Sequence, residues 1–252
     1  MRRMIAATLC SIAIPTGVFA HDIWTVPQAA NGATRVWVRF GEDPAHLETA
    51  DSHKIASLEL IAPSGRTSLK YPLTAATSGP LGLESKSFTA APGSIVAIAY
   101  DNGFWIADPD GPKGDAYVNT SKVLMPSGKE SYWVAKFGKT LLGPGSYKIH
   151  THTLLELIPL SDPYAGESRL KVRLEYKGKP VAGAKVTYGD GTTPIDSDKR
   201  PFVKTDKAGV VEIDLSRKGP YVLTADYMAP YMHRELADQA DLDATLAFDT
   251  TK

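Results

Sequence analysis

The sequence predicts an all-β protein made of two β-sandwich domains, and three observations favour this fold class. Short segments in which apolar and polar residues alternate recur along the chain, and Ser168–Tyr176 is the most regular of them. Turn sequences such as Ala91-Pro92-Gly93 and Gly143-Pro144-Gly145 separate these segments. No part of the chain is dominated by a helical period, and the content of 43% hydrophobic and 22% charged residues is that of a globular protein.

Residues 1–20 are predicted to be a secretory signal peptide. The segment opens with two arginines after the first methionine, continues as an apolar run and ends at the small residue Ala20. Cleavage after Ala20 leaves a mature chain that starts at His21 and has no cysteine, because Cys10 lies in the removed segment. No later stretch approaches the roughly 20 apolar residues of a membrane span. We therefore expect a periplasmic protein with no transmembrane segment in its mature chain.

The N-terminal domain is predicted over residues 21–160. Its least regular part, Leu124–Lys139, could include a short helix, and Ser146–Pro159 is predicted as one long strand or two broken ones. Clearer strands are expected where apolar residues are enriched and partly alternate with polar ones, at Val36–Phe40, Ser57–Ile61 and Ser94–Tyr100.

The C-terminal domain is predicted over residues 161–252, after the turn-rich segment Ser161–Gly166. Short strands spaced by turns fit a small sandwich of about seven strands. The order GKPVAGAKV, KTDKAGVVEIDL and GPYVLTADY resembles an Ig-like module of the transthyretin-like or carboxypeptidase-regulatory-like kind. Such modules serve many roles, so this resemblance implies a fold and not an activity.

The mature chain as a whole resembles one family. The segments AHDIW, YWVAKFGKTLLGPGSY, LELIPLSDPY and ADYMAPYMHR occur in the order found in the bacterial periplasmic NikM-like domain-of-unknown-function family. Members of that family were once labelled nickel or cobalt uptake components. The resemblance implies a secreted β architecture and an association with a transition metal. We expect a partner, either a membrane-bound metal transporter or an outer-membrane receptor.

Charge and motifs exclude several functional classes. Lysine plus arginine and aspartate plus glutamate each number 28, so the chain lacks the basic surplus of a nucleic-acid-binding protein. No Gly-x-Ser-x-Gly elbow and no glycine-rich phosphate loop is present. The acidic turns near Asp101 and Asp190 lack the ligand spacing of a calcium loop. Whether the protein is an enzyme stays open, and we assign no catalytic residue.

His21 is the first candidate metal ligand. As the N-terminal residue of the mature chain it offers a free amine and an imidazole nitrogen to one ion, which closes a chelate ring. The reference pKa of an α-amino group is about 7.7–8.0, so its deprotonation costs little at neutral pH. Nitrogen donors of this kind suit copper or nickel, and copper has the higher intrinsic affinity.

Three further histidines are candidate ligands. His150 and His152 are separated by one residue on a predicted strand, so alternation would place both side chains on one face. The two imidazoles would join His21 if the N-terminus reaches that face. His233 is the fourth candidate. All three histidines also have a simpler explanation: His150 and His152 could belong to the polar face of a strand, and His233 could be an ordinary surface residue.

Three functions are consistent with this sequence. The first is a periplasmic protein that binds nickel, cobalt or copper for uptake or homeostasis. The second is a metal-free module that docks to a receptor or a glycan. The third is a copper-dependent oxidase similar to polysaccharide monooxygenases, which also begin with a chelating histidine.

Overall fold

The computed structural model describes residues 21–30, 32–42, 46–76, 81–108, 117–195 and 199–251. The predicted signal peptide lies outside the described residues. Apart from the 3-10 helix η1 (Ser146–Lys148), all regular structure in these ranges is β-strand, which confirms the predicted fold class. None of the described segments forms a helix that is long and apolar enough to cross a membrane.

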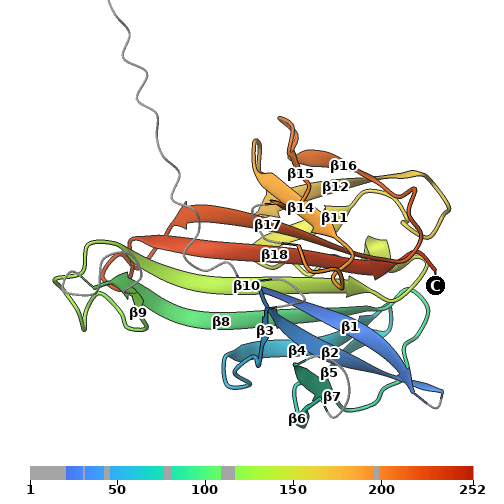
Figure 1. The fold of residues 1–252 in the computed structure, drawn as a ribbon, viewed down its shortest axis with the longest axis horizontal. Helices are drawn as coiled ribbons and strands as arrows, with labels where there is room; N and C mark the ends of the chain where they lie inside the picture. Colours follow the sequence, from blue (N-terminus) through green and yellow to red (C-terminus); the bar gives the residue numbers. More distant parts are fainter. Residues whose placement is uncertain are drawn as a thin grey trace, which may run out of the picture.

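Three sheets form the molecule, with a long central sheet between two smaller ones (Figure 1). The central sheet comprises, in spatial order, β15 (Phe202–Lys204), β14 (Lys185–Gly189), β17 (Pro220–Pro230), β18 (Gln239–Asp249), β10 (Ser131–Leu141), β8 (Ile95–Ala107), β4 (Ile55–Ala62) and β5 (Gly65–Ser68), with β9 (Tyr117–Val118) paired to β8. The N-terminal sheet comprises β1 (Asp22–Ala30), β2 (Ala33–Gly41), β7 (Leu83–Ser85) and β6 (Leu73–Ala75), with β3 (Leu47–Glu48) paired to β2. The third sheet comprises β11 (Leu155–Pro159), β12 (Arg169–Tyr176) and β13 (Lys179–Pro180), with β16 (Val210–Asp214) paired to β12.

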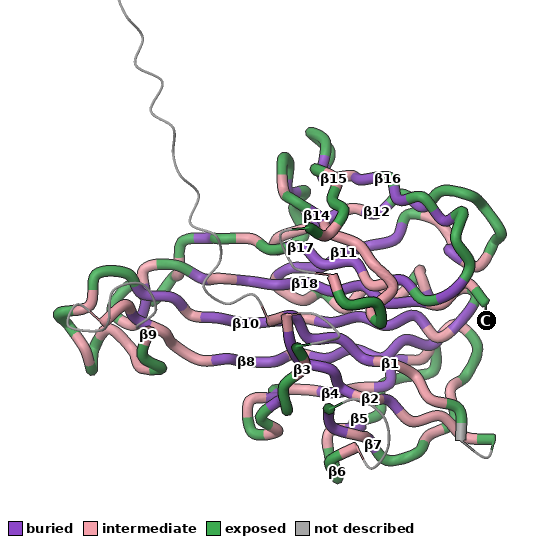
Figure 2. The backbone as a smooth tube through the Cα atoms, in the orientation of Figure 1, coloured by how far each residue is buried: buried purple, intermediate pink, exposed green. Residues whose placement is uncertain are grey.

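The alternation of side chains along the central strands creates a hydrophobic core on each face of the central sheet. In β8, Ile95 and Ala97 pack toward the third sheet, whereas Val96, Ile98 and Tyr100 pack toward the N-terminal sheet. Figure 2 shows that the buried stretches run through the middle of β8, β10 and β18, where both faces are covered. The two cores explain why these strands are rich in apolar residues at successive positions.

The central sheet continues across the boundary predicted at residue 160. Strands β10 and β18 lie side by side in parallel, so that Lys136 pairs with Asp243 and Phe137 with Ala244. Segment 161–252 contributes the strands β12 to β18, but four of them join the central sheet and three join the third sheet. The two predicted portions therefore share both of these sheets, because β10 and β11 come from residues before 161.

Two local predictions are corrected. The segment predicted as a possible short helix instead leads into β10, because its second half packs on both faces of the central sheet. The strand predicted over Ser146–Pro159 begins only at Leu155. The preceding residues form η1 and an irregular stretch in which His152 has a φ of 58°, a left-handed value that breaks strand geometry.

The first strand crosses the central sheet at very close range, and this fixes the position of the N-terminus. The hydroxyl of Thr245 donates to the carbonyl oxygen of Ile23 at 2.6 Å, and the hydroxyl of Thr140 donates to the carbonyl oxygen of Thr25 at 3.0 Å. A Cβ at Gly138 would lie 3.2 Å from the Ile23 carbonyl and 2.7 Å from Ile98 Cγ2. Glycine at position 138 is thus required by the passage of β1 over β10.

Candidate functional site

The side chain of His21 lies at the edge of the N-terminal sheet, just before β1. Its Nε2 is 3.2 Å from Oε1 of Glu48, and 37% of the His21 side chain is exposed to solvent. The imidazole stacks on Phe40 with a ring separation of 5.2 Å, and Phe40 in turn packs against Tyr100 at 5.2 Å. The ring is held between a carboxylate and an aromatic face while remaining accessible.

The contact of Nε2 with Glu48 decides which ring nitrogen of His21 is available to bind a metal ion. When Nε2 carries the proton, it donates to Glu48, and Nδ1 is left as the basic nitrogen. Nδ1 is also the ring nitrogen nearer to the main chain, so it is the one that can close a chelate ring with the amine of a chain starting at His21. A carboxylate on the outer nitrogen is the usual device that orients a metal-binding imidazole.

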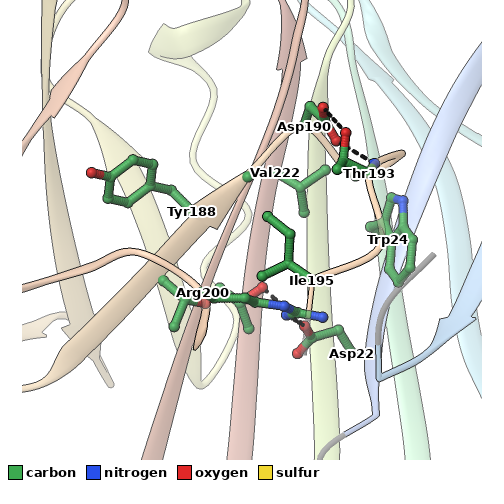
Figure 3. Close-up of a pocket in the computed structure, with 12 residues that line it drawn as sticks. Asp22, Trp24, Tyr188, Asp190, Thr193, Ile195, Arg200 and Val222 are labelled. Carbon is green, nitrogen blue, oxygen red and sulfur yellow. Dashed lines mark hydrogen bonds and ion pairs between the residues drawn. The ribbon is translucent and has the colours of Figure 1, made fainter. Parts of the chain in front are cut away.

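A carboxylate cluster begins at Asp22, the residue that follows His21 in the chain. Oδ2 of Asp22 accepts from Nη1 of Arg200 at 2.9 Å and from the hydroxyl of Thr224 at 3.2 Å (Figure 3). Burial raises the pKa of Asp22 to about 6, and the charge of Asp243 acts in the same direction, while Arg200 opposes it. Asp22 is thus both the second residue of the predicted mature chain and a buried member of the cluster.

The cluster is centred on Lys136, a lysine with no exposed surface. Its ammonium group donates to Asp243, the residue that pairs with it on the parallel strand β18. Asp226 pairs with Asp243 from the other side, on β17, and Asp241 lies two residues away on the same face of β18. Burial raises the pKa of Asp241 to about 7, and the charge of Asp243 contributes to the rise.

These raised values predict that acidification stabilises the protein. A carboxyl group with a higher pKa in the folded state binds its proton more tightly when the protein is folded. The resulting gain in stability is complete below about pH 4, and it is lost as the pH rises through the pKa values of the folded state. For Asp22 alone the difference of about two pKa units corresponds to about 3 kcal/mol. We expect a melting temperature about 5–10 °C higher at pH 5 than at pH 8.

Calorimetric melting across this pH range measures the effect. The substitution Asp241→Asn should flatten the curve, since an amide cannot titrate. A melting temperature that rises between pH 5 and pH 8 would contradict the assignment of raised pKa values to Asp22 and Asp241.

The structure brings His150 and His152 together, with their rings stacked at 5.8 Å. Glu156 holds the loop that carries them, because Oε2 accepts from the main-chain N–H of His152 at 3.0 Å and Oε1 accepts from Nζ of Lys139 at 2.6 Å. Lys139 belongs to the face of β10 that packs on the third sheet. The paired imidazoles and His21 therefore lie on opposite sides of the central sheet, and the structure does not join them.

His233 lies in the turn that connects β17 to β18. Its ring contacts Tyr231 at 5.9 Å, and its Nδ1 is 3.2 Å from Oε1 of Glu235. The strand register places this turn beside Tyr132, at the end of β10 remote from Lys139. Within the described ranges, no three histidine, cysteine, aspartate or glutamate side chains are arranged to hold one metal ion.

Sequence reasoning did not find the carboxylate cluster or the Lys139–Glu156 pair. A signal for both was present, because charged residues interrupt two otherwise apolar strands. Lys136 and Lys139 occur within YWVAKFGKTLL, and Asp241 and Asp243 occur within DLDATLAFD. A lysine in such a strand is buried only with a charged partner, so each lysine predicts a carboxylate opposite.

Fold and site together define an all-β protein of three packed sheets with an accessible histidine at the sheet edge. The family described as "Domain of unknown function (DUF4198)" matches residues 18–229, and the chain belongs to this family. No curated protein matches the chain. Among solved structures, the D0-D1 domain of Intimin matches with 11% sequence identity and a TM-score of 0.22, over 91% of this chain and 98% of that one.

Proposed function

We propose that this protein is a periplasmic transition-metal-binding protein whose mature N-terminus, His21, captures copper or nickel for uptake or homeostasis. The observation that carries the proposal is the 3.2 Å contact between Nε2 of His21 and Glu48. This contact leaves Nδ1 and the freed amine as the two chelating nitrogens. The resemblance to the NikM-like family, with its nickel and cobalt labels, points to the same class of ligand.

The residues of the site fit a weakly enclosed ion better than a fully enclosed one. Phe40 and Glu48 orient the imidazole, which reduces the entropy lost on binding. Two nitrogens from one residue leave the remaining coordination positions to solvent or to a second protein. Such a site suits an ion that must be handed on, and the expected recipient is a membrane-bound transporter or an outer-membrane receptor.

His150 and His152 form a separate pair of nitrogens on the far side of the central sheet. Their stacked rings, 5.8 Å apart, can turn toward a shared ion, which makes the pair a second candidate site. His233 is a single nitrogen donor paired with Glu235. These three residues serve as matched controls for His21, because their loss should leave the terminal chelate intact.

Calorimetric titration of the chain that starts at His21 with Cu²⁺ and Ni²⁺ tests the proposal. We expect tight binding of one ion, with copper bound more tightly. His21→Ala should abolish it, and so should a Gly-Pro extension that separates the amine from the imidazole. Glu48→Gln should weaken it by about tenfold, the size of effect seen when an outer partner of a ligand is lost.

The proposal fails if mass spectrometry of the exported protein places the mature N-terminus elsewhere. It also fails if the double substitution of His150 and His152 by alanine removes tight binding while His21→Ala retains it. That second result would move the metal to the other face of the molecule.

A further inference from the structure

We propose that the cavity beside Trp24 binds a small neutral organic molecule that has an apolar ring-sized body and one hydrogen-bond acceptor such as a carbonyl. The cavity has a volume of about 190 Å³ and lies between β1, the ends of β17 and β18, and the loop that follows β14. An apolar cavity of about 150 Å³ is large enough for benzene. The proposal is independent of metal binding at His21.

The indole of Trp24 supplies the first argument. Trp24 is 4% exposed as a residue, and its buried Nε1–H has no acceptor within the described part of the chain. A buried donor without a partner costs about 1–3 kcal/mol, so such groups require an explanation. In Figure 3 the indole nitrogen is turned toward the loop that carries Thr193.

The other three tryptophans differ from Trp24, because each of their indole N–H groups has an acceptor. Nε1 of Trp37 donates to Glu84 at 3.1 Å, Nε1 of Trp105 donates to the carbonyl oxygen of Asn102 at 3.0 Å, and Nε1 of Trp133 donates to Asp101 at 2.9 Å. The chain therefore satisfies three indole donors and leaves the fourth at the wall of a cavity. A ligand with an acceptor would satisfy it.

Gly191 lets the loop approach Val222 and the indole closely. Its φ is +67°, and a Cβ at this position would lie 2.6 Å from Cγ2 of Val222 and 3.6 Å from Nε1 of Trp24. A smaller cavity of about 40 Å³ adjoins at the same place, lined in part by Trp24, Gly191 and Val222. The indole N–H thus lies where the loop has no side chain to fill the gap.

The walls determine the chemistry of the ligand. Apolar surface comes from Val26, Leu141, Val222 and Ala247 among others, which suits an apolar body. The carboxylate of Asp190 also lines the cavity, but it accepts from the main-chain N–H groups of Thr192 and Thr193.

The charge of Asp190 excludes an acidic ligand. Burial acts against ionisation, but the hydrogen bonds from Thr193 and Thr192 outweigh it and lower the pKa of Asp190 to about 2. The carboxylate is therefore negative at every physiological pH and repels an anion. The indole N–H of Trp24 is the buried side-chain donor of the cavity wall that lacks an acceptor among the described residues, and it selects a neutral acceptor.

The probes cyclohexanone and methylenecyclohexane test the idea, because they share a shape and only the ketone has an acceptor. In ¹H–¹⁵N spectra of the metal-free chain starting at His21, cyclohexanone should shift the Trp24 indole peak saturably. The Trp37, Trp105 and Trp133 peaks, whose N–H groups have acceptors, should stay in place. Methylenecyclohexane should bind about tenfold more weakly, since it makes no hydrogen bond to the indole.

Two substitutions complete the experiment. Trp24→Phe identifies the peak and should make the two probes bind equally. Ala247→Leu, whose side chain grows into the cavity, should abolish binding of both, with its melting curve recorded to establish that it folds. The proposal is overturned if no saturable shift occurs at millimolar cyclohexanone, if both probes bind the unmodified chain equally, or if a folded Ala247→Leu protein still binds.

Discussion

Replacing Lys136 by methionine is expected to lower the free energy of unfolding by about 3–5 kcal/mol, the usual cost of breaking a buried ion pair from one side. Lys136 has no exposed surface, and its ammonium group is the partner of Asp243. Methionine keeps most of the volume of the side chain, so the loss would come from charge and not from a cavity. Equilibrium unfolding in urea at pH 8 measures it.

Two controls separate charge from packing. The double variant Lys136→Met with Asp243→Leu removes both partners and should recover most of the stability, because a buried pair replaced by apolar groups is often neutral. Lys136→Met alone should also lose less of its free energy of unfolding at pH 5, where Asp22 and Asp241 are more protonated. A loss below about 1 kcal/mol at pH 8 would mean that Asp243 is not buried against Lys136.

The strands could be predicted because their signal is local. Alternation along Ser168–Tyr176 and the apolar run around Ser94–Tyr100 correspond to β12 and β8, since a strand with a buried face needs apolar residues at every second position. The arrangement of the sheets could not be predicted. It depends on the parallel pairing of β10 with β18, about a hundred residues apart, and no local pattern specifies that pairing.

The candidate site was predicted only in part, for the same physical reason. His21 could be selected because a cleavage site is a local pattern, but its partner Glu48 comes from a two-residue strand that pairing with β2 brings alongside. The proximity of His150 and His152 was expected from strand alternation, whereas the loop achieves it through the hydrogen bonds of Glu156. Spacing alone could not show which face of the central sheet each histidine occupies.

Strand β10 carries the two buried lysines on opposite faces, and each holds a different neighbour of β10 in register. Lys136 faces the N-terminal sheet and is held by Asp243, while Lys139 faces the third sheet and is held by Glu156. An ion pair buried in apolar surroundings tolerates no shift of its partners, because a displaced charge would lose its compensation. Lys136 therefore stabilises the pairing of β10 with β18, the two strands whose Thr140 and Thr245 hold β1. Lys139 stabilises the imidazole loop through Glu156.

Replacing Glu156 by glutamine should be the most damaging change on the third-sheet side, with an expected loss of about 3–5 kcal/mol in the free energy of unfolding. Glu156 accepts from Lys139 at 2.6 Å and from the main-chain N–H groups of Thr151 and His152 at 2.8 and 3.0 Å. Lys139 and these N–H groups lower the pKa of Glu156 in spite of its burial. Glutamine removes the charge and turns an N–H group toward other donors.

The matched control is Glu212→Gln, which breaks an exposed ion pair with Arg169 and should cost less than about 1 kcal/mol. Urea unfolding compares the two variants, and imidazole resonances report whether His150 and His152 still stack. In the Glu156→Gln protein we expect the two rings to separate, because the loop residue with a φ of 58° is fixed by the carboxylate. Retention of the stacked pair in a protein of normal stability would show that the loop is ordered by its own conformation and not by Glu156.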